Sequence, residues 1–494
     1  MPVSKNNRKS KTSKSGKNRT SLLSHKKSGS ELQPRFAQLK NKLGERVIFS
    51  SWSNDRLPEM LWAAVIRVIS EQNYAITEFR RVISFVANHP KKEKMSDLSI
   101  TGISKLDKAL RHEFLENLLS NPITASALTV LLIFKDLPAR ESWLKFLPLT
   151  DEEPNLDLLM LAVGMCFPHQ SQEATDCRWL KVMLQVVSGK FHAPREMVEE
   201  WIDYPYKGDL RNIRPTIRSC EMTFNPMIEK DLTWVNKFWD SAWRNTPCLD
   251  LIRDDQTNEV APCCSTEGIS MLRQKLERHW IETHSTTDID AKHDGTFGIA
   301  FYSLTILSEI ASSNVRTGIL ARLGLRTILE AHINLRYLTL KDDKELWSKW
   351  RTYGAGQAKL NALKFDELVD SPNFINPEIL ESIAGEDLWE EFINIDLGSW
   401  SGADLRKISD SVGLKPVYDQ YYSWSSTYSH GTWGAIREVC FNTCGNPLHR
   451  LHRYPKESPL PDALYDACLL VNEILNDLSQ SYPSFSSRLL AEDR

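Results

Sequence analysis

Apolar residues recur at every third or fourth position through most of this chain from about residue 50 onward, and few stretches alternate as strands do. Leu61, Ala64 and Val65 begin one such pattern, and Ser53-Asn54-Asp55 before them are residues that commonly start helices. The loops between these stretches are short and rich in Pro, Asp or Gly, as they are between antiparallel helices. The spacing therefore predicts an all-α fold.

Composition divides the chain further. Residues 1–30 hold nine basic side chains, no acidic one and almost no apolar ones, which predicts a disordered basic tail because such a segment cannot bury enough surface to fold. The helical pattern breaks again around Pro262-Cys263-Cys264. We expect an N-terminal array of helical hairpins over residues 31–248, a linker over 249–267 and a C-terminal helical bundle over 268–494.

The overall charge hides an asymmetry. The 494 residues include 61 Lys and Arg against 64 Asp and Glu, a net charge of −3, but without the tail the remainder has 52 basic against 64 acidic residues. This balance argues against a broad basic binding face, and we expect any polyanion to bind the tail or a small pocket. Neither common glycine-rich phosphate loop occurs, which argues against P-loop and Rossmann nucleotide binding.

Cysteine content and the distribution of apolar residues bear on the compartment in which the protein works. Nine cysteines are scattered along the chain without the density of a disulfide scaffold, so we expect reduced thiols. The first residues lack the apolar core of a signal peptide, and the apolar stretches 128–134 and 158–167 are at most about half of a membrane span. These features predict a cytoplasmic protein with no membrane partner.

Four potential metal ligands lie close together near the C-terminus. Cys440, Cys444, His449 and His452 would suit zinc, but the spacer between the cysteine pair and the histidine pair is shorter than a zinc finger requires. We expect two buried cysteines and two loop histidines here, and no metal or cofactor, although the sequence leaves zinc binding by this cluster open.

Charged residues interrupt the apolar pattern of residues 321–332. Four-residue spacing places Arg322, Arg326 and Glu330 along one stripe of a helix, with His332 on a neighbouring face. One interpretation is a structural Arg–Glu pair that braces the bundle. The other is a guanidinium positioned for phosphate, with Glu330 fixing its orientation.

A second segment, residues 418–433, concentrates hydroxyl groups, aromatic rings and a histidine. If it is helical, Tyr418, Tyr422, Ser426 and His430 share one face. A histidine at a helix end can titrate near neutral pH and act as a general acid or base. The alternative is an aromatic core strip whose hydroxyls bond the neighbouring backbone.

Together the two segments resemble an uncharacterised family of bacterial all-helical proteins, over roughly residues 297–435. That pattern is an Arg-x-x-x-Glu helix followed by a Tyr/Ser-rich helix that ends in His. Such proteins are similar to the HEPN superfamily, whose members are often metal-independent ribonucleases of antiviral or toxin systems. The superfamily motif, Arg followed by His after four to six residues, matches Arg326 and His332.

The resemblance implies a catalytic site. On a straight helix Arg326 and His332 point about 120° apart, so we prefer Arg326 with His430 and keep His332 as the superfamily's candidate. The histidine would take the ribose 2′-hydroxyl proton and the arginine would stabilise the phosphorane-like transition state. Substrate contacts are expected from the following residues: Arg322, Tyr422, Ser426, Tyr428 and Trp424.

Two functions follow from these observations. The first is an effector of a bacterial anti-phage defence or toxin system that cleaves RNA by HEPN-like chemistry. The second is a non-enzymatic helical adaptor or sensor that binds a protein partner or a second copy of itself. An enzyme should place Arg326 and a histidine in one open cleft, whereas an adaptor should bury them against neighbours.

Overall fold

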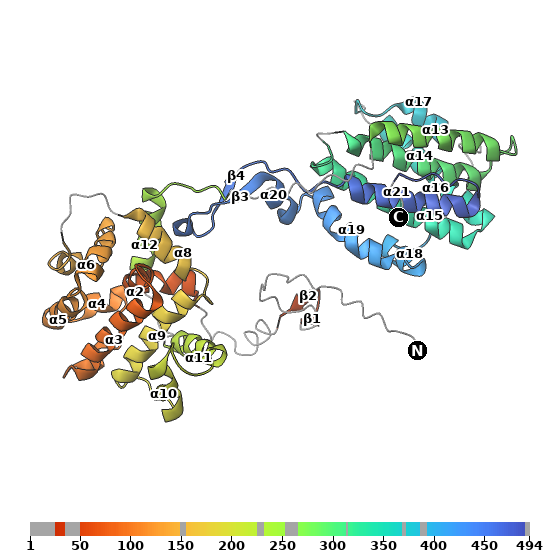
Figure 1. Ribbon diagram of the computed structural model, residues 1–494. Coiled ribbons are helices and arrows are strands. Elements are labelled where there is room, and N and C mark those ends of the chain that lie inside the picture. The colour runs from red at the N-terminus through yellow and green to blue at the C-terminus, as the bar shows by residue number, and fades with distance from the viewer. Residues whose placement is uncertain are drawn as a thin grey trace, which may run out of the picture. The chain divides into compact units, whose positions relative to one another are not determined.

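The protein is all-α, as the spacing predicts (Figure 1). The computed structural model describes residues 25–34, 50–148, 155–224, 232–251, 265–312, 315–367, 372–385 and 393–489. Most of the predicted basic tail lies outside these ranges. Its last residues belong to a short antiparallel hairpin of β1 (Lys26–Ser28) and β2 (Glu31–Gln33).

The chain forms two compact units. The N-terminal unit comprises the described residues up to Leu249 together with Cys444–His452, and the C-terminal unit comprises Asp250–Thr443 and the residues from Arg453 onward. The predicted boundary at residue 248 did not anticipate that a segment from late in the chain belongs to the N-terminal unit. Most of the predicted linker lies outside the described residues.

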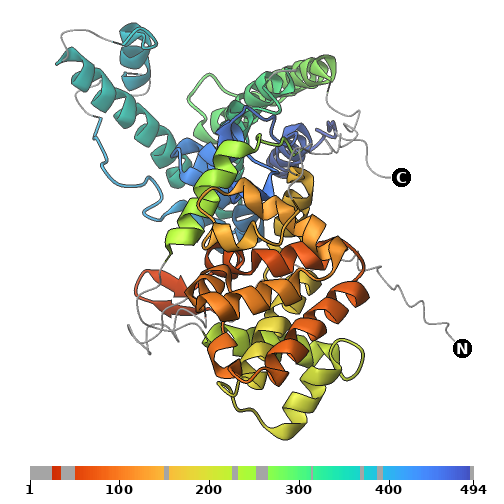
Figure 2. The same ribbon diagram turned by 90° about the vertical axis from the view of Figure 1, so that its left-hand side faces the viewer.

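The N-terminal unit is built from short helices around α2 (Leu61–Val68), seen in red to yellow in Figure 2. Residues on every side of α2 are buried, because α3, α6, α8 and α9 all pack against it. The remaining helices surround this centre: α3 (Gln72–Asn88), α4 (Ile100–Lys105), α5 (Lys108–Leu118), α6 (Pro122–Leu128), α7 (Arg140–Trp143), α8 (Leu156–Cys166), α9 (Gln172–Val187), α10 (Arg195–Asp203), α11 (Leu210–Thr223) and α12 (Thr233–Asn245).

Buried charges in this unit are paired. Glu221 on α11 is fully buried, 2.7 Å from Arg56 Nη1 and 2.8 Å from Arg178 Nε. Burial alone would raise the pKa of Glu221, but Lys181, Arg56 and Arg178 around it lower the pKa below its ordinary value. The carboxylate therefore stays charged in the interior.

The C-terminal unit is a helical bundle centred on α15 (Ile319–Lys341), which packs against α14, α19 and α21. Gly324 lets α14 approach closely, since a Cβ there would lie 2.9 Å from side-chain atoms of Ile306 and Ile310. The other helices are α13 (Thr266–Thr283), α14 (Ala291–Ala311), α16 (Lys344–Asp366), α17 (Pro377–Ala384), α18 (Leu405–Ser411), α19 (Lys415–Ser429), α20 (Trp433–Cys440) and α21 (Leu464–Ser481).

One short hairpin leads out of this bundle and back. Strands β3 (Phe441–Thr443) and β4 (Arg453–Pro455) pair antiparallel, and the residues between them are those that join the N-terminal unit. The intervening segment includes a 3₁₀ turn at Pro447–His449, which contacts α8 and α12.

Two expectations from composition can be compared with the fold. No described helix has the length and apolar character needed to span a bilayer. Reduced thiols are found at Cys166, Cys177, Cys220, Cys248, Cys440 and Cys444. The prediction is wrong for Cys468, which is in a disulfide.

Candidate functional site

Arg326 is held from two sides on the partly exposed face between α15 and α19. Its Nε donates to Glu330 Oε1 at 2.8 Å, one helical turn away, and its Nη2 donates to the Tyr422 hydroxyl at 3.0 Å. The guanidinium also lies 4.8 Å from the centroid of the Tyr422 ring, and Tyr418 stacks on that ring. The side chain of Arg326 is 19% exposed, so this guanidinium is both oriented and accessible.

Electrostatics favour the charged form of Arg326. Burial lowers the pKa of Arg326, but the hydrogen bond and charge of Glu330, together with Tyr422, outweigh burial and raise it. Nη1 makes no hydrogen bond to any residue that the structure describes. The cluster can therefore offer one further charged donor to an anion.

His332 does not join Arg326. It is buried on another side of α15, where its Nε2 lies 3.3 Å from Asp477 Oδ2 on α21. Arg336 approaches the other oxygen of Asp477 at 2.8 Å. Arg326 and His332, which match the spacing of the HEPN motif, therefore lie in two separate environments. Their separation of about 120° around a straight helix is consistent with this.

His430 lies just beyond the C-terminus of α19 and is exposed. Gly431 follows with φ of +54°, a conformation that ends the helix. Ser426 and His430 lie one and two turns beyond Tyr422, so His430 is about 12 Å farther along the helix axis. The structure thus places His430 on the predicted stripe but away from Arg326.

The other predicted substrate contacts divide into two groups. Arg322 donates to the backbone carbonyls of Arg316 and Pro461, and Tyr428 donates to Glu438 at 2.5 Å. Burial, together with Glu438, raises the pKa of Tyr428 to about 12. Both side chains brace the bundle rather than face a ligand.

Trp424 is 52% exposed but projects from the opposite flank of α19, two residues and about 200° from Tyr422. There it lies over Gly434 and makes an edge contact with Tyr428. Trp424 therefore cannot stack a base on the same face as the Arg326 cluster.

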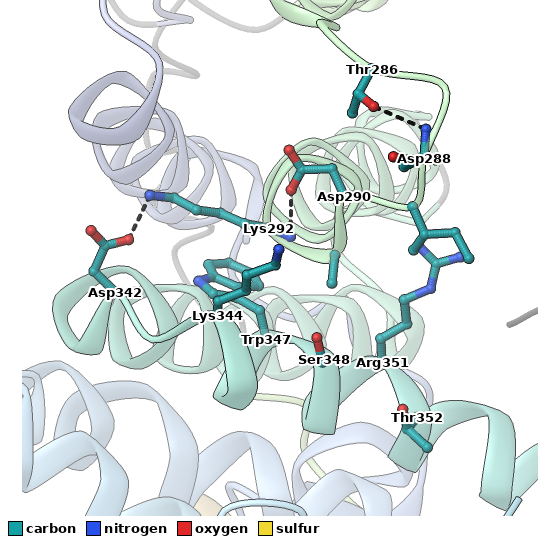
Figure 3. A pocket seen from close by; sticks show the side chains of 12 residues that line it. Thr286, Asp288, Asp290, Lys292, Asp342, Lys344, Trp347, Ser348, Arg351 and Thr352 are labelled. Atoms are coloured by element: carbon teal, nitrogen blue, oxygen red, sulfur yellow. Dashed lines mark hydrogen bonds and ion pairs between the residues drawn. The ribbon is translucent and has the colours of Figure 1, made fainter.

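A cavity of about 460 Å³ lies elsewhere in the C-terminal unit, between the start of α14 and the start of α16 (Figure 3). Asp290 at its rim caps α14, and Lys292 pairs with Asp342 at 2.5 Å. None of the predicted site residues lines this cavity. Its charged groups serve mainly as helix caps and ion pairs.

A second cluster contains three of the four residues that the sequence spacing indicated as potential metal ligands. Cys444, His449 and His452 converge, but the fourth member is Cys248, at the end of the N-terminal unit, and not Cys440. One ligand atom from each of the four lies within 4.8 Å of all the others. The spacing of Cys444, His449 and His452 was visible in the sequence. Cys248 carried no local signal, because it lies far from them in the chain.

Part of the chain matches a known protein family. Residues 307–446 match DUF5677, a family of unknown function. This range contains Arg326, Glu330, Tyr422 and His430, which confirms the expected resemblance to an uncharacterised family, but nothing links the chain to the HEPN superfamily. Among curated proteins and among solved structures, none matches this chain.

Proposed function

We propose that the C-terminal unit binds RNA at the face between α15 and α19, with Arg326 as the phosphate contact. One observation carries this proposal: Glu330 and Tyr422 each hold one nitrogen of the guanidinium, while Nη1 has no hydrogen bond to a described residue. A guanidinium oriented in advance loses little conformational freedom when it binds a phosphate oxygen.

The residues beyond Tyr422 fit the same ligand. Ser426 and His430 follow along α19, and hydroxyl and imidazole groups commonly contact phosphate and ribose. The basic tail would add sequence-independent attraction, and the acidic body favours a small site over a broad face.

RNA cleavage stays a prediction. His430 would be the base on this face, because His332 is buried against Asp477. His430 lies about 12 Å along the axis of α19 from Tyr422, the residue that contacts Arg326. Arg326 and His430 would therefore contact different nucleotides of an extended strand. A role as an effector of a defence or toxin system depends on that activity, and we therefore propose binding alone.

The test compares two arginines that make the same kind of helical pair. Arg326 pairs with Glu330 on α15, and Arg273 pairs with Glu277 on α13, both at i, i+4. In the full-length chain, Arg326→Ala should weaken binding of a labelled single-stranded RNA by about tenfold, the equivalent of one charged hydrogen bond. Arg273→Ala should leave the affinity within about twofold.

The tail is present in every variant, so its contribution cancels in this comparison. Equal affinities for the Arg326→Ala and Arg273→Ala chains would remove the proposal. RNA that stays intact with the wild-type chain, or that the His430→Ala chain cleaves equally well, would count against cleavage by this face.

The adaptor function has an observation of its own. Trp424 and Trp433 are 52% and 61% exposed in the C-terminal unit, and large exposed aromatic rings are typical of protein interfaces. As a second candidate, this surface would bind another copy of the chain. Sedimentation velocity over a range of concentrations should then show self-association that Trp433→Glu weakens, and a wild-type chain that stays monomeric would exclude it.

A further inference from the structure

We propose that Cys248, Cys444, His449 and His452 bind a zinc ion. All four belong to the N-terminal unit, because the segment Cys444–His452 packs there although it comes late in the chain. Two thiol and two imidazole ligands form a set that zinc favours, whereas calcium and magnesium prefer oxygen ligands.

The distances fit tetrahedral coordination. Cys248 Sγ lies 3.7 Å from His449 Nδ1 and 3.3 Å from His452 Nε2, and Cys444 Sγ lies 3.4 Å from His449 Nδ1. With usual zinc–sulfur and zinc–nitrogen bond lengths, a sulfur and a nitrogen on one tetrahedral ion are separated by about 3.6 Å. The four side chains are therefore already arranged around a space of the right size.

The atoms behind the ligands hold them in place. His449 Nε2 lies 3.0 Å from the Thr246 hydroxyl and 3.2 Å from the Thr246 carbonyl oxygen. Donation of the Nε2 proton to Thr246 leaves the lone pair of Nδ1 directed at the two sulfurs, which is how metal-binding histidines are usually oriented.

Cys444 is supported in a similar way. Its Sγ accepts the backbone N–H groups of Leu249 and Asn446, each at 3.4 Å. These two N–H groups hold the sulfur in position, as outer contacts commonly do for metal ligands. Asn446 is fully buried and donates to Thr246 and to the Pro247 carbonyl, so the two ligand-bearing segments are also joined directly.

The turn that carries the histidines is specialised. Arg450 and Leu451 both have positive φ, at 49° and 57°, and the backbone N–H of Cys444 donates to the carbonyl of His452. Trp243 on α12 packs against the rings of both His449 and His452. With four protein ligands no position is open for a substrate, so the zinc would be structural and would fasten residues 444–452 to the end of α12.

The experiment measures zinc in the full-length chain by mass spectrometry, after purification without chelators. We expect close to one equivalent in the wild-type chain and in Cys440→Ser, which alters the exposed cysteine of the original spacing pattern. Cys248→Ser should lose most of the zinc. Cys248 is exposed, so this variant should keep its fold, which circular dichroism can check.

Two further measurements separate the possible results. Cobalt substituted for zinc should give the visible absorption of a tetrahedral site with thiolate ligands, and Cys248→Ser should weaken it. Chelation should increase hydrogen exchange in residues 444–452 without changing α14 and α15. A wild-type chain without zinc, a disulfide between Cys248 and Cys444, or equal zinc in Cys248→Ser and Cys440→Ser would each overturn the proposal.

Discussion

His332 and Asp477 form a buried pair in the C-terminal unit, with Nε2 of the imidazole 3.3 Å from the carboxylate and both side chains at most 1% exposed. Arg336 completes the group from the next turn of α15. The three groups are within ion-pair distance, although neither His332 nor Arg336 is aligned for a hydrogen bond to the carboxylate. This relationship indicates that His332 stabilises the bundle.

Asp477→Asn should lower the free energy of unfolding by about 3 kcal/mol, because it removes the charge of a fully buried carboxylate that lies within ion-pair distance of His332 and Arg336. Denaturant unfolding measures this. Glu473→Gln, on the same helix and 50% exposed, is the control and should change stability by no more than about 0.5 kcal/mol. RNA affinity should be unchanged in both folded variants, and a loss of RNA binding in Asp477→Asn alone would return His332 to the ligand site.

Local spacing predicted the fold class well and the helix ends less well. The apolar spacing over residues 317–340 predicts one long helix, and the structure contains it as α15, Ile319–Lys341. The spacing over residues 103–119 likewise predicts one helix, but the structure has a break there: α4 ends at Lys105, and Asp107 starts α5 by accepting a hydrogen bond from the Leu110 N–H. The apolar pattern continues across this break, so periodicity alone could not show it.

The Arg326 cluster and the Cys/His cluster differ in how far apart in the sequence their residues lie. Arg326 and Glu330 are one turn apart, and their pairing follows from spacing on a helix. The contact of Tyr422 with Arg326 depends on how α19 packs against α15. That packing is determined by long-range contacts. Cys248 shows the same limit more strongly, since only the return of residues 444–452 to the N-terminal unit brings it to the histidines.

Gly324→Ala should destabilise the C-terminal unit by about 1–3 kcal/mol, since the added methyl group would lie 2.9 Å from atoms of Ile306 and Ile310. Gly298→Ala on α14 is the matched change, because its Cβ would meet no atom within 4 Å. It should instead stabilise the chain by about 0.5–1 kcal/mol, through the higher helix propensity of alanine. Thermal unfolding of both variants tests the packing of α14 on α15, and equal effects would contradict it.

Stability should fall as the pH drops below about 6.5, in part because of His293. Burial lowers the pKa of His293, and His284 and His279 act in the same direction against Asp290 and Asp294. The unfolded chain therefore binds a proton more readily than the folded one, and acid shifts the equilibrium toward unfolding.

Unfolding free energies measured from about pH 5 to pH 8 should show this slope in the wild-type chain. His293→Gln should have a shallower slope than wild type below pH 6.5. His430→Gln, which changes an exposed histidine of the same unit, should keep the wild-type slope. Identical slopes for wild type and His293→Gln would show that His293 does not contribute.

Tyr422→Phe separates the orientation of Arg326 from its presence. The phenylalanine ring keeps the contact beneath the guanidinium but loses the hydroxyl that accepts the Nη2 proton. RNA affinity should fall by about twofold to fivefold, less than the fall of about tenfold expected for Arg326→Ala, because one neutral acceptor contributes about 0.5–1 kcal/mol. Tyr421→Phe is the matched control, since its hydroxyl donates to Asp466 at 2.8 Å on the core side of α19. Both changes remove one hydroxyl from the same helix and should lower stability by a similar amount. If RNA binds at Arg326, only the Tyr422 variant should lose RNA affinity, which fluorescence anisotropy measures. Equal losses in the two variants would mean that α19 affects binding through its stability and not through the position of Arg326.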